Sequence, residues 1–125
     1  MKIINLTQHP AAAEQVAAGV FDLTGEAREK LVSLLNFSTL PTEQKILDRA
    51  HDIALLVALE HETCQTAMIG GALWLMAPLA RELREQGIEP FFAFTSREAV
   101  EEKQADGSIR KTAVFRHAGF VPAVE

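Results

Sequence analysis

The sequence is poor in cysteine and in positive charge, and both shortages exclude classes of protein. Its 125 residues include a single cysteine, Cys64, so an intramolecular disulfide and a cysteine-rich zinc site are excluded. The formal net charge is −5. Electrostatic binding to duplex nucleic acid over a wide surface usually needs a basic face, so we expect no binding of that kind. A small phosphate-bearing ligand held by a few local donors is compatible with this charge.

Long apolar runs are also missing. The longest, "AMIGGALWLMAPLA", is too short to span a bilayer and contains two glycines and a proline. The apolar stretch in the opening "MKIINLTQHP" is too short for a signal peptide. No repeat or low-complexity linker interrupts the chain, and its length suits one domain. We therefore expect a single cytoplasmic domain, residues 1–125, without a membrane segment.

The histidines form no familiar metal site. His51 and His61 are ten residues apart, a spacing typical of no zinc pair. Exposed positions on a long helix or at its end account for both of them. His9 and His117 lie outside that helix. We expect neither a metal nor a cofactor.

Short apolar runs alternate with helical patterns along the chain. Apolar, often β-branched runs bounded by polar or glycine-rich stretches predict strands, and alanine-rich or i, i+3, i+4 apolar spacing predicts helices. This alternation favours an α/β sandwich with a mostly parallel sheet. The last two strands read as an antiparallel hairpin with a long, charged connection. The expected strands are 2–6, 20–23, 66–71, 89–97 and 109–121, and the expected helices are 10–19, 24–37, 40–62 and 72–87.

Polar or glycine residues follow three of the expected strands. They are Asn5 to His9, Gly70-Gly71, and Thr95 to Arg97. In open α/β sheets, ligands bind beyond the carboxyl ends of the strands. We call these three segments the three corners, and we expect them to lie close together and to bind a phosphodiester jointly.

The first corner, "NLTQHP", combines amide, hydroxyl and imidazole side chains. It offers Asn5, Thr7 and Gln8 as ligand-binding groups and His9 as a general acid or base. The alternative is an ordinary polar turn that leads into the next helix.

The second corner, "IGGAL", passes from strand to helix through Gly70 and Gly71. Such a junction lets backbone N–H groups approach an anion, assisted by the helix dipole. It is neither the dinucleotide fingerprint nor a P-loop. The alternative is that the glycines only allow the strand and the helix to pack closely.

The third corner, "FTSRE", ends an apolar strand with two hydroxyls and a guanidinium. Arg97 is suited to hold a phosphate, and Thr95 or Ser96 to bond a phosphate or ribose oxygen. The alternative is a solvated turn in which Arg97 pairs with Glu98 or Glu101. Exposed pairs of that kind contribute little to stability, so they do not by themselves require these residues.

The charged segment "REAVEEKQADGSIRK" and the strand after it supply the last candidates. Lys111 faces a ligand if the hairpin closes over the site as a lid, although most such charge runs are solvated loops. His117 is the last ligand-binding candidate and shares a strand face with Phe115. A histidine among aromatic residues is more often a core or interface residue than a catalyst.

Two stretches of the chain resemble a known family. The end, "PFFAFTSREAVEEKQADGSIRKTAVFRHAGFV", resembles the C-terminal part of small CRISPR-associated proteins with a Rossmann-like fold. In that group a strand ends in a Thr/Ser-x-Arg turn, and a charged hairpin and a "VFxHxxF" strand follow. The start, "INLTQHPAAAEQ", is similar to the same group, in which a hydroxyl or Asn and a His follow the first strand.

The resemblance implies a specific activity. The group is related to the CARF domains, which sense cyclic oligoadenylates, and several of its members are proposed ring nucleases. Such enzymes cleave the signalling ring without metal, by in-line attack of a ribose 2′-hydroxyl on the adjacent phosphate, and thereby end an antiviral response. They generally act as homodimers. On this resemblance, His9 and Arg97 are the expected catalytic residues and cyclic tetra-adenylate is the expected ligand.

Three functions stay open on the sequence alone. The first is the metal-independent ring nuclease. The second is a protein of the same fold that binds or sequesters a cyclic nucleotide without cutting it. The third is a dimeric interaction module without a ligand, whose apolar surface around Trp74 or Phe120 docks a partner.

Overall fold

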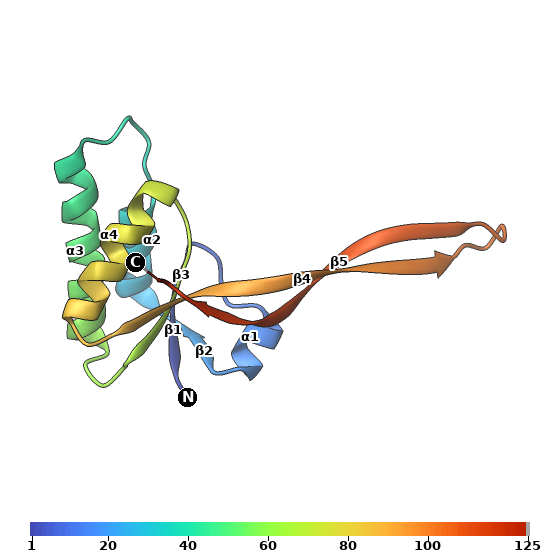
Figure 1. Ribbon diagram of the computed structural model, residues 1–125, viewed down its shortest axis with the longest axis horizontal. Coiled ribbons are helices and arrows are strands. Elements are labelled where there is room, and N and C mark those ends of the chain that lie inside the picture. The colour runs from blue at the N-terminus through green and yellow to red at the C-terminus, as the bar shows by residue number, and fades with distance from the viewer. Residues whose placement is uncertain (125) are drawn as a thin grey trace.

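The computed structural model describes residues 1–124, and a five-stranded mixed sheet lies at its centre (Figure 1). The strand order is β2-β1-β3-β4-β5, with β1 to β4 parallel and β5 antiparallel to β4. The predicted α/β class, the mostly parallel sheet and the C-terminal hairpin are confirmed. The bounds are Ile3–Leu6 for β1, Val20–Asp22 for β2, Thr66–Ile69 for β3, Glu89–Lys103 for β4 and Ile109–Pro122 for β5.

The four helices of residues 1–124 cover the two faces of the sheet unequally. α2 (Gly25–Leu35), α3 (Glu43–Glu60) and α4 (Leu73–Glu85) lie together on one side, and the short α1 (Ala13–Ala17) lies on the other (Figure 1). α1 is shorter than the helix expected over 10–19. The backbone N–H of Ala11 donates to Asp22 Oδ1 at 3.0 Å, which holds the residues after β1 in an extended path before the helix begins.

The main core fills the space between the sheet and the three packed helices. Strands that are buried on both faces carry continuous apolar runs, and all four residues of β1 are buried. A second, smaller cluster on the α1 side joins Ile3, Val20 and Met68, with Phe120 packed against it. The fully buried side chains of the main core include Ile4, Leu6, Leu31, Ile53, Ile69, Leu75, Leu79 and Leu83.

The expected long, charged connection between the last two strands is wrong. β4 does not end at Arg97 but continues to Lys103, and only residues 104–108 connect it to β5. The charged residues of this segment are compatible with strands because residues of opposite charge face one another across the two paired strands. Glu101 pairs with Lys111, with 3.9 Å between Oε1 and Nζ, and Glu102 pairs with Arg110.

The tip of the hairpin is a tight turn around Asp106 and Gly107. Gly107 has a φ of +89°, which favours glycine. The Asp106 carboxylate accepts hydrogen bonds from the hydroxyl and the backbone N–H of Ser108. These bonds, the hydroxyl first, lower the pKa of the Asp106 carboxyl.

A β-bulge marks the place where the hairpin leaves the body of the protein. Phe94 pairs with Gly119 and Thr95 with His117, so Ala118 is the extra residue on β5. Beyond this bulge the two strands extend away from the rest of the molecule as a long ribbon (Figure 1). We call residues 95–117 the arm.

Candidate functional site

The connections that leave β1 and β3 diverge onto opposite faces of the sheet. β1 leads through α1 to β2, whereas β3 leads through α4 to β4 on the other side. In open α/β sheets such a switch point is the usual place for a ligand. Leu6 and Ile69 are register partners, so the segments that begin at Thr7 and at Gly70 leave the sheet side by side.

The first two predicted corners meet at this point. A Cβ atom placed on Gly70 would lie 3.3 Å from Thr7 Cγ2, so a larger residue at position 70 would crowd the loop after β1. Gly71 follows with a φ of +143°, which favours glycine. The predicted convergence of Thr7 with Gly70 and Gly71 therefore holds in the fold.

The N-terminus of α4 opens toward the same edge. Its N-cap residue, Ala72, has no side chain that could accept a hydrogen bond from the first turn. The backbone N–H of Leu75 donates to the carbonyl of Ala72 at 3.0 Å, so the N–H groups of Leu73 and Trp74 are the ones in this turn left for an external acceptor. The helix dipole favours an anion there. This end of α4 follows directly on Gly70 and Gly71.

Asn5 is the buried anchor of the "NLTQHP" loop. Its Nδ2 donates to Asp22 Oδ1 and to the carbonyl of His9, both at 2.8 Å. Its Oδ1 accepts from the backbone N–H of Thr7 at 2.9 Å and from the Thr7 hydroxyl at 2.7 Å. Because both donors and both acceptor positions of the amide are used within the protein, Asn5 fixes the loop and presents no free group at the surface.

Sequence reasoning missed a second layer of residues that support this loop. Asp22, at the end of β2, accepts from Asn5 and Ala11. Arg28 donates through Nη2 to the carbonyl of Gln8 at 2.9 Å. Its Nη1 is buried and makes no hydrogen bond among residues 1–124, although it lies 4.0 Å from Asp22 Oδ1. The carboxylate that ends the strand "VFD" was a signal for Asp22, whereas nothing in the helix pattern distinguished Arg28.

His9 and Gln8 differ in how free their side chains are. Gln8 donates through Nε2 to Asn36 Oδ1, so its amide is engaged with the segment after α2. The His9 residue is exposed, and within residues 1–124 only its backbone carbonyl accepts hydrogen bonds. The imidazole is the loop group most accessible to a ligand.

The third predicted corner does not join the other two within one protomer. Thr95 to Arg97 is not a strand end, because β4 continues through it in register with β5. Phe92 is the register partner of Ile69, the last residue of β3, and Arg97 follows it by five positions. At about 3.3 Å per residue this places Arg97 about 16 Å farther along the strand.

The other candidates from the C-terminal half also lie on the arm. Arg97, Lys111 and their neighbours line a surface depression of about 330 Å³. His117 pairs with Thr95, and its ring lies 4.8 Å from that of Phe120. Ser96 pairs with Arg116, which reaches Glu14 of α1 at 3.9 Å, so the base of the arm lies beside α1.

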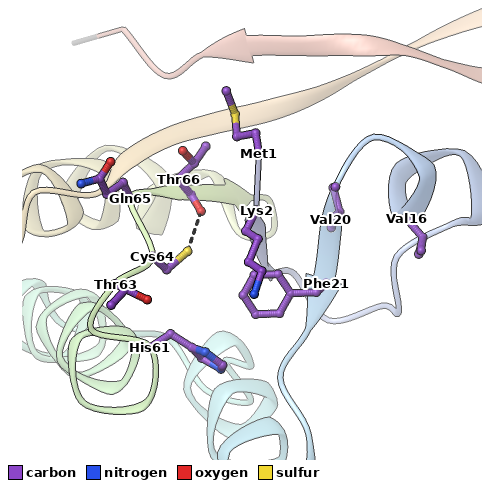
Figure 2. Close-up of a pocket in the computed structure, with 11 residues that line it drawn as sticks. Met1, Lys2, Val16, Val20, Phe21, His61, Thr63, Cys64, Gln65 and Thr66 are labelled. Atoms are coloured by element: carbon purple, nitrogen blue, oxygen red, sulfur yellow. Dashed lines mark hydrogen bonds between the residues drawn. The ribbon is translucent and has the colours of Figure 1, made fainter.

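A cavity of about 770 Å³ lies at the opposite edge of the sheet, where the parallel strands begin (Figure 2). The Cys64 thiol donates to the carbonyl of Thr66 at 3.3 Å, and the His61 ring packs edge-on against Phe21 at 5.1 Å. His61, expected to be exposed, is half-buried here. The lining residues come from separate parts of the chain, among them Lys2, Phe21, His61 and residues 63–66, so the sequence contained no local signal for this cavity.

Two further searches of the described residues bear on the site. Residues 1–124 contain no group of three or more His, Cys, Asp or Glu side chains placed to hold a metal ion. Within the same residues, each helix is too short or too polar to traverse a bilayer.

The fold and the residues at its switch point define the class: a mixed α/β protein in which a polar loop and a glycine-rich helix start lie side by side at the carboxyl edge of the sheet. Residues 1–121 match the model described as the Uncharacterized protein MJ1673 family, and the chain belongs to that family. No curated protein and no solved structure matches the chain.

Proposed function

We propose that this protein binds a cyclic oligoadenylate at the switch point of a Rossmann-like sheet and cleaves it without a metal, ending a CRISPR-type signal in the cytoplasm. The observation that carries the proposal is the meeting of the loop after β1 with Gly70, beside the uncapped start of α4. The ring-nuclease resemblance of both chain ends specifies the ligand and the reaction.

The glycine corner is suited to a phosphodiester. The backbone N–H groups that follow β3 can approach a phosphate closely because Gly70 and Gly71 carry no side chain. The dipole of α4 adds to the attraction. An acidic protein needs such local donors, since its net charge of −5 repels a polyanion at long range.

The reaction supplies its own nucleophile. A bond forms between the ribose 2′-oxygen and phosphorus, the bond from phosphorus to the 5′-oxygen breaks, and a linear product with a 2′,3′-cyclic phosphate results. The protein must hold the three atoms in line and move one proton from the 2′-hydroxyl and one to the 5′-oxygen. His9 is our candidate for both proton transfers, because imidazole is the most common general acid and base in enzymes and the residue is exposed.

Incubation of the purified protein with labelled cyclic tetra-adenylate in EDTA tests the proposal. We expect linear oligoadenylates with 2′,3′-cyclic phosphate ends. Cyclic tetra-adenylate that carries 2′-O-methyl groups is the matched control, and it should bind but stay intact because its nucleophile is blocked. Absence of binding to every cyclic oligoadenylate size would overturn the proposal.

A ring-binding protein without catalysis is the second candidate. It is favoured by the distance of Arg97 from the switch point along β4 and by the engagement of the Thr7 hydroxyl with Asn5. Both leave fewer groups to stabilise a transition state within one protomer. The same EDTA experiment separates the two candidates, because a binder returns the ring uncut.

Gly70→Ala distinguishes a ligand-binding glycine from a packing glycine. The new Cβ would crowd Thr7 Cγ2, so we expect a stability loss of at most about 1 kcal/mol. It would also stand between a phosphate and the backbone, so ring affinity should fall about tenfold. Urea unfolding and calorimetric titration measure the two effects.

Adding Thr7→Ser removes the crowded methyl group and serves as the control. The double variant should recover the stability of Thr7→Ser alone but not its ring affinity. Recovery of both would show that Gly70 serves packing only.

A further inference from the structure

The arm is a long two-stranded ribbon that projects from the body of the protein with little to support it. An isolated two-stranded hairpin is at best marginally stable in water, and each strand of the arm leaves one row of backbone N–H and C=O groups unpaired. The side chains do not compensate. Ile109 and Phe115, on the same face of the ribbon, are 62% and 69% exposed.

The charge of the arm is opposite to that of the remaining chain. Residues 95–117 contain five Lys and Arg and four Asp and Glu, a net charge of +1, which leaves −6 for the remainder of the −5 chain. The arm is therefore electrostatically complementary to the body of another copy.

The arm also carries cationic side chains, which the residues at the switch point do not supply. It continues β4 past the carboxyl edge of the sheet, the same edge at which Thr7, His9 and Gly70 lie. Arg97 and Lys111 lie on one face of it. Within one chain the arm extends away from the rest of the molecule (Figure 1), so these two positions on β4 and β5 lie away from the switch point of the same chain.

We propose that the arm docks on a second copy of this chain, over the carboxyl edge of the partner's sheet, and supplies Arg97 and Lys111 to the phosphate site there. A two-fold arrangement makes the exchange reciprocal, so each arm covers the other copy's site. The phosphate role of the two cations rests on the proposed function; the docking itself does not.

The interface is tested by sedimentation over a dilution series, without ligand. The wild-type chain should be a dimer, and Phe115→Ser should raise the dimer dissociation constant at least about tenfold. Leu59→Ser is the matched control, because Leu59 on α3 is similarly exposed, at 74%, but lies off the arm. It should leave the dimer unchanged. A monomeric wild type, or equal effects of the two variants, would overturn the docking.

The exchange of residues is tested by mixing two defective chains. His9→Ala and Arg97→Ala should each be weak in ring cleavage. In a mixed dimer, the site formed by the Arg97→Ala body and the His9→Ala arm is intact. Equal mixing should restore about a quarter of the wild-type rate, since half of the dimers are mixed and each has one intact site.

The outcomes separate the two proposals. No recovery on mixing, with an active wild type, would overturn the supply of Arg97 by the partner. If the wild type cleaves no ring but Phe115→Ser alone weakens the dimer, the docking stands and the proposed function fails.

Discussion

Replacing His9 by alanine is expected to slow the cleavage of cyclic tetra-adenylate by about 10²- to 10⁴-fold, the usual contribution of a general acid–base group. Ring affinity should change by less than about threefold, because the amides after β3 and the start of α4 stay in place. Single-turnover cleavage and calorimetric binding separate these effects. Added imidazole should restore part of the rate, since it can carry the same proton.

His51→Ala is the matched control for this experiment. His51 is an exposed histidine on α3, and its Nδ1 lies 3.3 Å from Oε2 of Glu82, which is near the end of α4 opposite the candidate site. Its replacement should leave cleavage unchanged. The imidazole of His9 makes no hydrogen bond with the described residues, so His9→Ala should also unfold at the wild-type urea concentration. Wild-type cleavage by a folded His9→Ala variant would remove His9 from the reaction.

The class of fold followed from the sequence because local patterns and tertiary burial agree. "KIINL" and "TAMIGG" are apolar on both faces, as strands covered on two sides must be, and β1 and β3 are indeed buried. The leucines of α4 recur at helical spacing, and Leu75, Leu79 and Leu83 are all fully buried. For these strands and for α4, the apolar pattern was compatible with only one type of secondary structure.

The arm was missed because a charged run has two interpretations. "REAVEEKQADGS" fits a solvated loop by composition, and local propensity does not reveal the partner strand that turns it into a ladder. The pairing of Glu101 with Lys111 depends on register. Register is set by the tight turn at Asp106 and Gly107 and by the bulge at Ala118, and the bulge has no local signal in the sequence.

The candidate site was only partly predictable for a related reason. Strand ends of a parallel sheet share an edge, so the strand pattern alone was enough to pair Thr7 with Gly70. Arg97 was included on the assumption that β4 ends with its neighbours, and the continuation to Lys103 removes that assumption. Arg28 and Asn36 contact Gln8 because the tertiary fold places α2 and the residue after it beside the loop that follows β1. The sequence pattern does not reveal that placement.

Asn5→Ala is expected to lower the free energy of unfolding by about 2–4 kcal/mol. The side chain is fully buried and holds four partners: the Asp22 carboxylate, the His9 carbonyl, and the backbone and hydroxyl of Thr7. Its removal leaves buried polar groups without their hydrogen bonds, which costs more than the loss of a surface contact. Urea unfolding measures the change.

Asn5→Asp tests the direction of these bonds while keeping the shape. In Asn5→Asp, an acceptor oxygen replaces Nδ2 and faces Asp22 Oδ1 and the His9 carbonyl, which are themselves acceptors. The pKa of the new carboxyl in the folded protein should therefore be raised, so that stability increases as the pH falls and protonation returns one donor. Asn5→Ala has no such titration.

Asn36→Ala controls for the loss of an amide as such. Asn36 is exposed, so its replacement should change stability by no more than about 0.5 kcal/mol. If Asn5→Ala were equally mild, the loop after β1 would be held by other contacts and the Asn5 amide would be free to turn toward a ligand. A large loss confined to Asn5 instead means that this residue acts on the candidate site through His9 and Thr7, by fixing the backbone that presents them.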